Sequence, residues 1–257
     1  MGGVKSKFSQ VEWEAADGGL ESAEQTLDGA APTSEYTMLT LVKTSKVKDR
    51  GFNVFLMPPG TTADAAQQSG SPQYKVKKID WSWNSFEVFD ASGKLCVRVI
   101  PGKILSSFSW KIVSTKGPKF NGQEPDPEAL KKKDDTSTAL YKWFKVEYST
   151  SLFKAKMRAY EPVRADDDPN PLGEVHKDSG PLLELDEIRS AKARFQTSRP
   201  DHPDSLLSYW EWQNSMKEHK MVLHVAKHSD TLLHVVLAVL ANLTMIERQA
   251  SYNSGNY

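Results

Sequence analysis

Two short stretches of the sequence alternate basic residues with other residue types, which places the cations on one side of an extended strand. In the stretch 152–160, LFKAKMRAY, the basic residues are Lys154, Lys156 and Arg158. Successive side chains of a strand point to opposite faces, so these three would project from one rigid face. Aligned cations of this kind can hold a phosphorylated lipid headgroup. The alternative interpretation is an ordinary solvated outer face.

The second stretch is YKVKKI at 74–79, where Lys75 and Lys77 are in register and Lys78 points the opposite way. It is a further candidate for binding an anionic headgroup. The run 131–133, KKK, is a weaker candidate, because Asp134 and Asp135 follow it and cancel much of its field. The residues alone do not decide among these groups.

The N-terminal residues MGGVKSKFSQ carry a modification signal. Gly2 and Ser6 match the pattern M-G-x-x-x-[ST], which predicts N-myristoylation of Gly2. The alternative is a plain flexible N-terminus. One myristoyl chain binds membranes only marginally, so stable attachment would require a second surface directed at lipid. The basic strands are the candidates for that surface.

Signals for catalysis or metal binding are weak. The sequence has no HExxH, no Cys/His metal spacing, no G-x-S-x-G elbow and no phosphate-binding glycine loop. Asp166 and Asp168 begin a calcium-loop spacing, but Pro171 and Lys177 stand where that loop needs Gly and Glu. His234 lies in an apolar run, where we expect a core histidine satisfied by a backbone group. We therefore expect no catalytic residue, no cofactor and no metal site.

The composition excludes some classes of protein. The 257 residues include 33 basic and 33 acidic side chains, so no overall positive field marks a nucleic-acid-binding protein. The 39% hydrophobic and 10% aromatic content indicates a folded core. The single cysteine, Cys96, allows no internal disulfide, and its apolar neighbours predict a buried hydrophobe. With no N-terminal apolar signal region, we expect a cytoplasmic protein.

Most of the chain from residue 36 onward consists of short alternating runs separated by turn residues, which predicts close to twelve strands arranged as a sandwich or barrel. The turn 90–93, DASG, joins two of these runs into a hairpin. Two polar loops at 117–135 and 161–181 interrupt the series. The predicted strands are 36–43, 52–57, 74–79, 85–90, 94–100, 108–113, 141–149, 152–160, 191–197, 207–214 and 220–226.

The segment 231–246, TLLHVVLAVLANLTMI, is apolar on every face, with Asp230 as its N-cap and 247–248, Glu-Arg, as a polar stop. As a helix it would be about 24 Å long, short of the roughly 30 Å hydrocarbon layer of a bilayer. A segment too short to span a membrane and too apolar to face water is expected inside protein. Because twelve strands enclose more space than their own side chains fill, a central helix suits such a barrel.

This order of elements resembles the tubby C-terminal-like superfamily, which includes tubby, the phospholipid scramblases and the plant LURP-one-related proteins. The resemblance covers about residues 36 to 249. It rests on the hairpin pattern F-x-V-x-D-x-x-G, with Phe86, Val88, Asp90 and Gly93, and on the final segment that begins at Asp230. It implies a closed twelve-stranded barrel around a C-terminal hydrophobic helix, and a module that binds phosphoinositides through basic side chains. The cysteine clusters and Pro-rich arm of the scramblases are absent from this sequence.

These observations predict a flexible arm at 1–34, a barrel domain at 35–249 and a tail at 250–257. The expected function is that of a non-enzymatic protein, peripheral on the cytoplasmic face of a membrane. Its partners would be anionic lipids, bound through Lys75, Lys77, Lys154, Lys156 or Arg158, with a myristoyl group on Gly2. One alternative is a scaffold subunit that docks proteins through the loops 117–135 and 161–181. Another is a scramblase-like or lipid-modifying activity.

Overall fold

The computed structural model describes residues 36–44, 51–58, 60–79, 85–102, 108–115, 141–150, 155–160, 180–188, 194–212, 220–226 and 229–254. The N-terminal arm, with Gly2 and Ser6, lies outside the described residues. So do Lys154, the run 131–133, and the two polar loops 117–135 and 161–181 apart from Gly180 and Pro181. The predictions made for these residues remain predictions.

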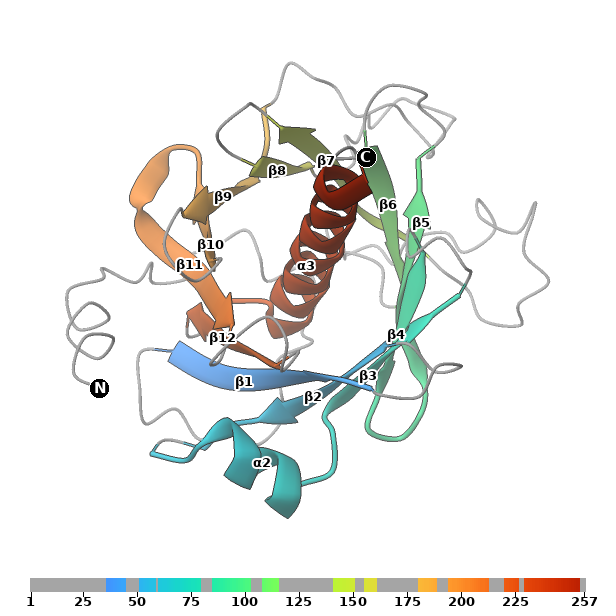
Figure 1. The fold of residues 1–257 in the computed structure, drawn as a ribbon, viewed down its shortest axis with the longest axis vertical. Coiled ribbons are helices and arrows are strands. Elements are labelled where there is room, and N and C mark those ends of the chain that lie inside the picture. Colours follow the sequence, from blue (N-terminus) through green and yellow to red (C-terminus); the bar gives the residue numbers. More distant parts are fainter. Residues whose placement is uncertain are drawn as a thin grey trace, which may run out of the picture.

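The described strands form one closed antiparallel barrel, in which each strand pairs with its neighbours in the sequence and β1 pairs with β12 (Figure 1). The predicted fold class is confirmed. The twelve described strands are β1 (Tyr36–Lys43), β2 (Gly51–Leu56), β3 (Tyr74–Lys78), β4 (Phe86–Asp90), β5 (Leu95–Pro101), β6 (Phe108–Ser114), β7 (Tyr141–Thr150), β8 (Ala155–Tyr160), β9 (Leu183–Ile188), β10 (Arg194–Arg199), β11 (His202–Trp212) and β12 (Lys220–Ala226).

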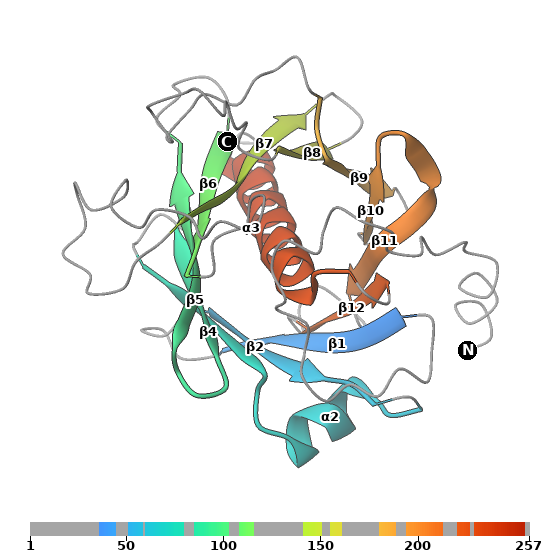
Figure 2. The ribbon, with the colours of Figure 1, turned by 180° about the vertical axis from the view of Figure 1, so that it is seen from behind.

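The helix α3 (Thr231–Ser254) runs through the middle of the barrel, and strands surround it in both views (Figures 1 and 2). The apolar side chains described on this helix are buried on every side, with Val235 0%, Val236 0% and Leu237 1% exposed. The wall of strands therefore encloses the helix, as predicted. Among the described residues, no helix combines the length and the apolar character needed to cross a bilayer.

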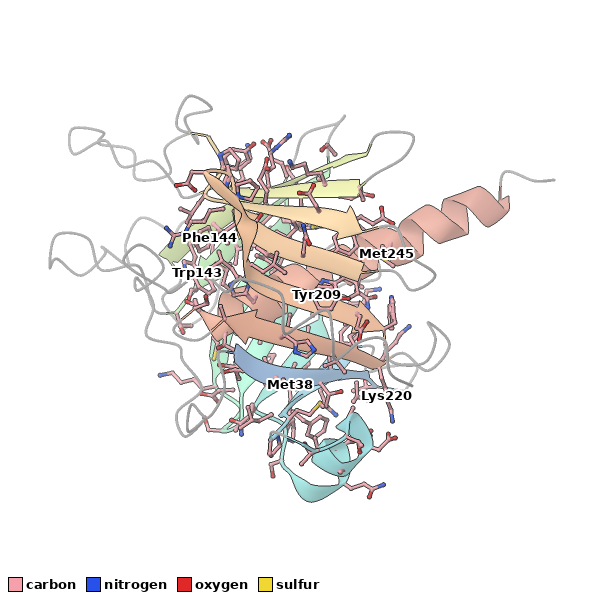
Figure 3. The ribbon with its side chains drawn as sticks, turned by 90° about the vertical axis from the view of Figure 1, so that its left-hand side faces the viewer. Met38, Trp143, Phe144, Tyr209, Lys220 and Met245 are labelled. Carbon is pink, nitrogen blue, oxygen red and sulfur yellow. The ribbon has the colours of Figure 1, made fainter. Side chains whose placement is uncertain are left out.

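The start of α3 is where the sequence predicts it, but the end is not. The Asp230 carboxylate accepts a hydrogen bond from the Leu233 amide at 3.1 Å, which is the geometry of an N-cap. The predicted stop at Glu247 and Arg248 is wrong, because the helix continues to Ser254. Neither residue breaks a helix, and no Gly or Pro follows before Ser254. Met245 lies near the rim of the barrel, and the last turns extend beyond the strands (Figure 3).

The strands place every second side chain inside the barrel. In β3, Tyr74 and Val76 are 6% and 4% exposed, while Lys75 and Lys77 between and after them are exposed. In β8, Ala155, Met157 and Ala159 are buried and alternate with half-buried polar residues. The inner side chains pack around α3 as one continuous core. The outer side chains are therefore held at fixed positions on a rigid wall.

Two elements were not predicted. Strand β9, LELDEI, comes shortly after the loop 161–181, and Glu187 stands where the alternation begun by Leu183 and Leu185 would place a third apolar residue. Helix α2 (Ala63–Ser69) has small and polar residues with no large apolar face. It packs on the outside of the barrel, where Ala63 and Ala66 cover Met57 and Val222.

Candidate functional site

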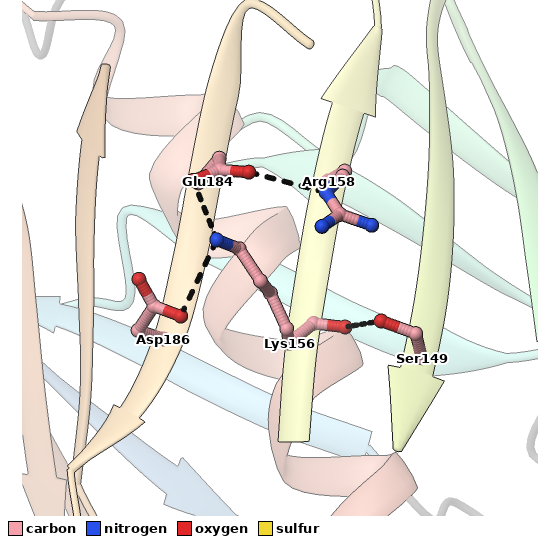
Figure 4. A network of polar contacts seen from close by, with 5 residues as sticks. All are labelled: Ser149, Lys156, Arg158, Glu184 and Asp186. Carbon is pink, nitrogen blue, oxygen red and sulfur yellow. Dashed lines mark hydrogen bonds and ion pairs between the residues drawn. The ribbon is translucent and has the colours of Figure 1, made fainter. Parts of the chain in front are cut away.

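The cations of β8 face acidic residues of β9 (Figure 4). The Lys156 Nζ atom lies 2.6 Å from Glu184 Oε2 and 3.8 Å from Asp186 Oδ1. The Arg158 Nε atom donates to the other oxygen of Glu184 at 3.1 Å. Both cations of β8 therefore share one carboxylate, with a second carboxylate close to Lys156.

This arrangement follows from the pairing of the two strands. Lys156 is in register with Asp186 and Arg158 with Glu184, so opposite charges face each other across the ladder. Burial alone would raise the pKa of Glu184, but the hydrogen bonds from Lys156 and Arg158 lower it below the usual range. Glu184 is therefore ionised at neutral pH, and the two acids compensate the two bases. The β8 face, as the structure describes it, has no net positive charge to offer an anion.

The outer face of β3 differs in its charge balance. Lys75 and Lys77 are exposed, and none of the ion pairs formed by the described residues includes either of them. The Lys77 Nζ atom lies 4.9 Å from the centroid of the Phe89 ring on β4, which is a cation–π contact. The neighbouring strand thus gives Lys77 an aromatic face in place of a carboxylate.

Glu87 is the acid that could have neutralised Lys77, since the two are in register across β3 and β4. Its carboxylate is bound to Arg98 of β5 instead. Glu87 Oε1 accepts from Arg98 Nε at 2.9 Å and lies 2.7 Å from a terminal nitrogen of the same guanidinium. Two contacts to one guanidinium fix the carboxylate away from β3, so Lys77 keeps its charge available.

Hydrogen bonds close the turn between β4 and β5, which begins directly after Phe89. Gly93 has φ of 85°, a conformation that side-chain-bearing residues rarely adopt. The Asp90 amide donates to the Lys94 carbonyl at 3.0 Å, and the Asp90 carboxylate accepts from the Lys94 amide at 2.9 Å. Burial would raise the pKa of Asp90, but the hydrogen bonds from Ser92, Lys94 and Gly93 lower it. The predicted hairpin is confirmed.

Two histidines, His224 and His234, have buried side chains in the described part of the chain. His234 points from α3 into the core, is 1% exposed, and neither ring nitrogen has a hydrogen-bond partner. The expectation that a backbone group satisfies it is wrong, because the surrounding wall supplies apolar side chains. His224 lies on β12 beside Tyr209, with ring centroids 6.2 Å apart. Burial lowers the pKa of His224 to about 4 and that of His234 to about 3.

Two tryptophans and the single cysteine pack in the core or against it. Trp210 and Trp212 are 1% and 2% exposed and pack edge to face in the core of the barrel. Cys96 is partly exposed where a buried residue was expected, although it packs against the main core. Across the described part of the chain, no group of three or more His, Cys, Asp or Glu side chains could hold a metal ion.

The sequence analysis missed the acids that compensate β8 and the contact that holds α2. Glu184 and Asp186 lie on the strand that was not predicted. The ion pair between Lys220 and Asp64 ties β12 to α2 (Lys220 is labelled in Figure 3). An alternating pattern in 183–188, with Leu183 and Leu185 inside, was the available signal for β9.

No family model matches the sequence, and the comparison with curated proteins gave no match. The X-ray structure of a protein from Arabidopsis thaliana is similar to this chain with a TM-score of 0.44 and 12% sequence identity. The similarity covers 83% of this chain and 93% of that protein. A similarity of this size supports no conclusion about family or activity.

Proposed function

We propose that the protein is a non-enzymatic, membrane-peripheral protein that binds anionic phospholipids through the outer face of β3. The observation that carries this proposal is the difference between the two basic strands. Lys75 and Lys77 are exposed and belong to no ion pair among the described residues, whereas Lys156 and Arg158 are paired with Glu184. Of the two basic faces that the structure describes, only that of β3 offers uncompensated positive charge.

The geometry of the barrel prevents the outer faces of β3 and β8 from contacting the same membrane at the same time. In the closed order β3-β4-β5-β6-β7-β8, β8 is five steps from β3, which places the two strands on nearly opposite walls of the twelve-stranded ring. A flat bilayer can contact only one of these walls at a time. The proposed orientation therefore has β3 toward the lipid and β8 toward solvent.

The expected affinity is modest and needs a second tether. A lysine near an anionic membrane surface contributes about 1 kcal/mol, so Lys75 and Lys77 together contribute about 2 kcal/mol. A myristoyl group on Gly2 would add a marginal, reversible attachment. Two weak signals on one chain act together, which gives stable binding to the cytoplasmic face of a membrane.

Vesicle flotation of the full-length myristoylated chain tests the proposal. On vesicles that contain phosphatidylserine, the Lys75→Ala/Lys77→Ala variant should bind about 30-fold more weakly than wild type, as expected for the loss of about 2 kcal/mol. The Lys156→Ala/Arg158→Ala variant removes the same charge from the opposite wall and is the matched control, expected to bind like wild type. Gly2→Ala tests the acyl tether separately.

The outcomes separate clearly. Equal loss of binding in both double variants would show that total charge matters and that β3 has no special role. Unchanged binding in the β3 variant would remove the proposed surface. The resemblance to tubby-like proteins agrees with a lipid-binding module but is not needed for this test. The scaffold alternative depends on the loops 117–135 and 161–181, which lie almost entirely outside the described residues, and no observation favours it or the scramblase-like alternative.

A further inference from the structure

Ile79 is the one exposed large hydrophobic side chain among the described residues, with an exposed fraction of 49%. It comes directly after β3, whose outer face carries Lys75 and Lys77. A single exposed apolar residue needs no explanation by itself. Its position next to the two uncompensated lysines, however, suggests a function for it.

The backbone places Ile79 in line with the lysines. The Ile79 amide donates to the Ser85 carbonyl at 3.1 Å, so the ladder between β3 and β4 continues past Lys78. Alternation along the strand then puts Lys75, Lys77 and Ile79 on the same side. At a rise of about 3.3 Å per residue, they form a row about 13 Å long with the apolar residue at one end.

This row, which we call the β3 ridge, matches an anionic bilayer better than a free anion. A free phosphate compound would engage the two cations and leave Ile79 in water. A bilayer offers a plane of negative charge next to an apolar layer, so it can meet all three side chains at once. We infer that Ile79 is an apolar anchor that enters the interfacial layer of an anionic membrane while Lys75 and Lys77 bind its surface charge.

The inference fixes how the barrel sits on the membrane. Ile79 lies at the end of β3 that leads toward β4, so that end of the hairpin is directed into the interface. The outer faces of the neighbouring strands, including Phe89 beside Lys77, lie close to the headgroups. An aromatic side chain at that depth is in a favourable environment.

This inference rests on the proposed function, and vesicle flotation across a series of salt concentrations distinguishes the two. The Ile79→Ala variant of the full-length chain should bind phosphatidylserine vesicles on the order of tenfold more weakly at every salt concentration, because apolar burial is not screened by salt. Its dependence of log affinity on log salt should keep the wild-type slope. The Ile79→Trp variant should bind more tightly.

Tyr160→Ala serves as the control, since it removes an apolar ring from the outer face of β8 and should bind like wild type. Wild-type binding by Ile79→Ala, or a loss that disappears at high salt, would overturn the anchor while leaving the lysine surface intact. Wild-type binding by Lys75→Ala/Lys77→Ala would instead overturn the proposed function.

Discussion

Glu184 receives hydrogen bonds from both Lys156 and Arg158, while Glu87 turns toward Arg98 and leaves Lys77 beside Phe89. The chemistry of the basic side chains is similar in the two places. What differs is the strand beside them, which supplies carboxylates in one case and an aromatic ring in the other. Whether a cation on the barrel surface keeps its charge uncompensated is therefore a property of three adjacent strands, and residue type alone does not determine it.

The two buried histidines make stability depend on pH. The pKa of His224 is lowered to about 4 and that of His234 to about 3, each from an ordinary value of 6.5. Below pH 6.5 the unfolded chain binds protons that the folded chain excludes, so stability falls as the pH falls. Well below pH 6.5, each histidine lowers the free energy of unfolding by about 1.4 kcal/mol per pH unit. The two together lower it by about 3 kcal/mol per pH unit.

Denaturant unfolding at pH 6.0 and pH 5.0 measures this effect. Both pH values lie above 4.5, the ordinary pKa of the Glu184 carboxyl group. Because folding lowers that pKa, Glu184 reduces the stability of the protein only at more acidic pH. The wild type should lose about 2.4 kcal/mol between the two pH values, and His234→Leu should lose about half of that. An equal loss in the variant would show that His234 is not a buried neutral imidazole in the folded state.

At the scale of elements, close approach of two strands fixes the position of the β3 ridge. A Cβ atom added to Gly51 of β2 would lie 1.9 Å from the Val76 carbonyl oxygen of β3. Gly51 is in register with Lys77, so the absence of a side chain there lets β2 lie tightly against β3. The glycine therefore contributes to the geometry of the outer face that carries the β3 ridge.

The Gly51→Ala substitution should lower the free energy of unfolding by about 1–3 kcal/mol, because the backbone of one strand must move. Gly70→Ala is the matched control, since its added Cβ would meet only an ordinary contact at 3.4 Å. Thermal unfolding of both variants measures the difference. If the Gly51→Ala variant were as stable as the Gly70→Ala variant, β2 and β3 would not be packed too tightly to accept a side chain at position 51.

Sequence patterns predicted most elements but not their partners. Alternation identified β3 and β8, and the apolar run identified α3, because each pattern is local. Strand β9 was missed because Glu187 interrupts its alternation after two leucines, and the acids Glu184 and Asp186 were missed with it. Without β9, the cations of β8 appeared uncompensated. The charge balance of a sheet face depends on which strands are neighbours, and a single sequence does not state that pairing.

At the scale of the whole molecule, the barrel encloses its helix and its outer walls differ in charge. Enclosing α3 fills the interior, so function is expected on the outer surface. The closed order of strands separates the β3 ridge from the charge-compensated β8 face by nearly half of the ring. Membrane binding should therefore have a defined orientation, with one wall in contact with lipid and the other in solvent.

Site-specific photocrosslinking tests that orientation most directly. A benzophenone amino acid at Asn53 reports on the β3 side, because Asn53 pairs with Lys75, and one at Ser149 reports on the β8 side, because Ser149 pairs with Lys156. Both substitutions leave the lysines in place. After irradiation with phosphatidylserine vesicles, mass spectrometry should find lipid adducts at position 53 and none at position 149. Adducts at position 149 with none at position 53 would contradict the account.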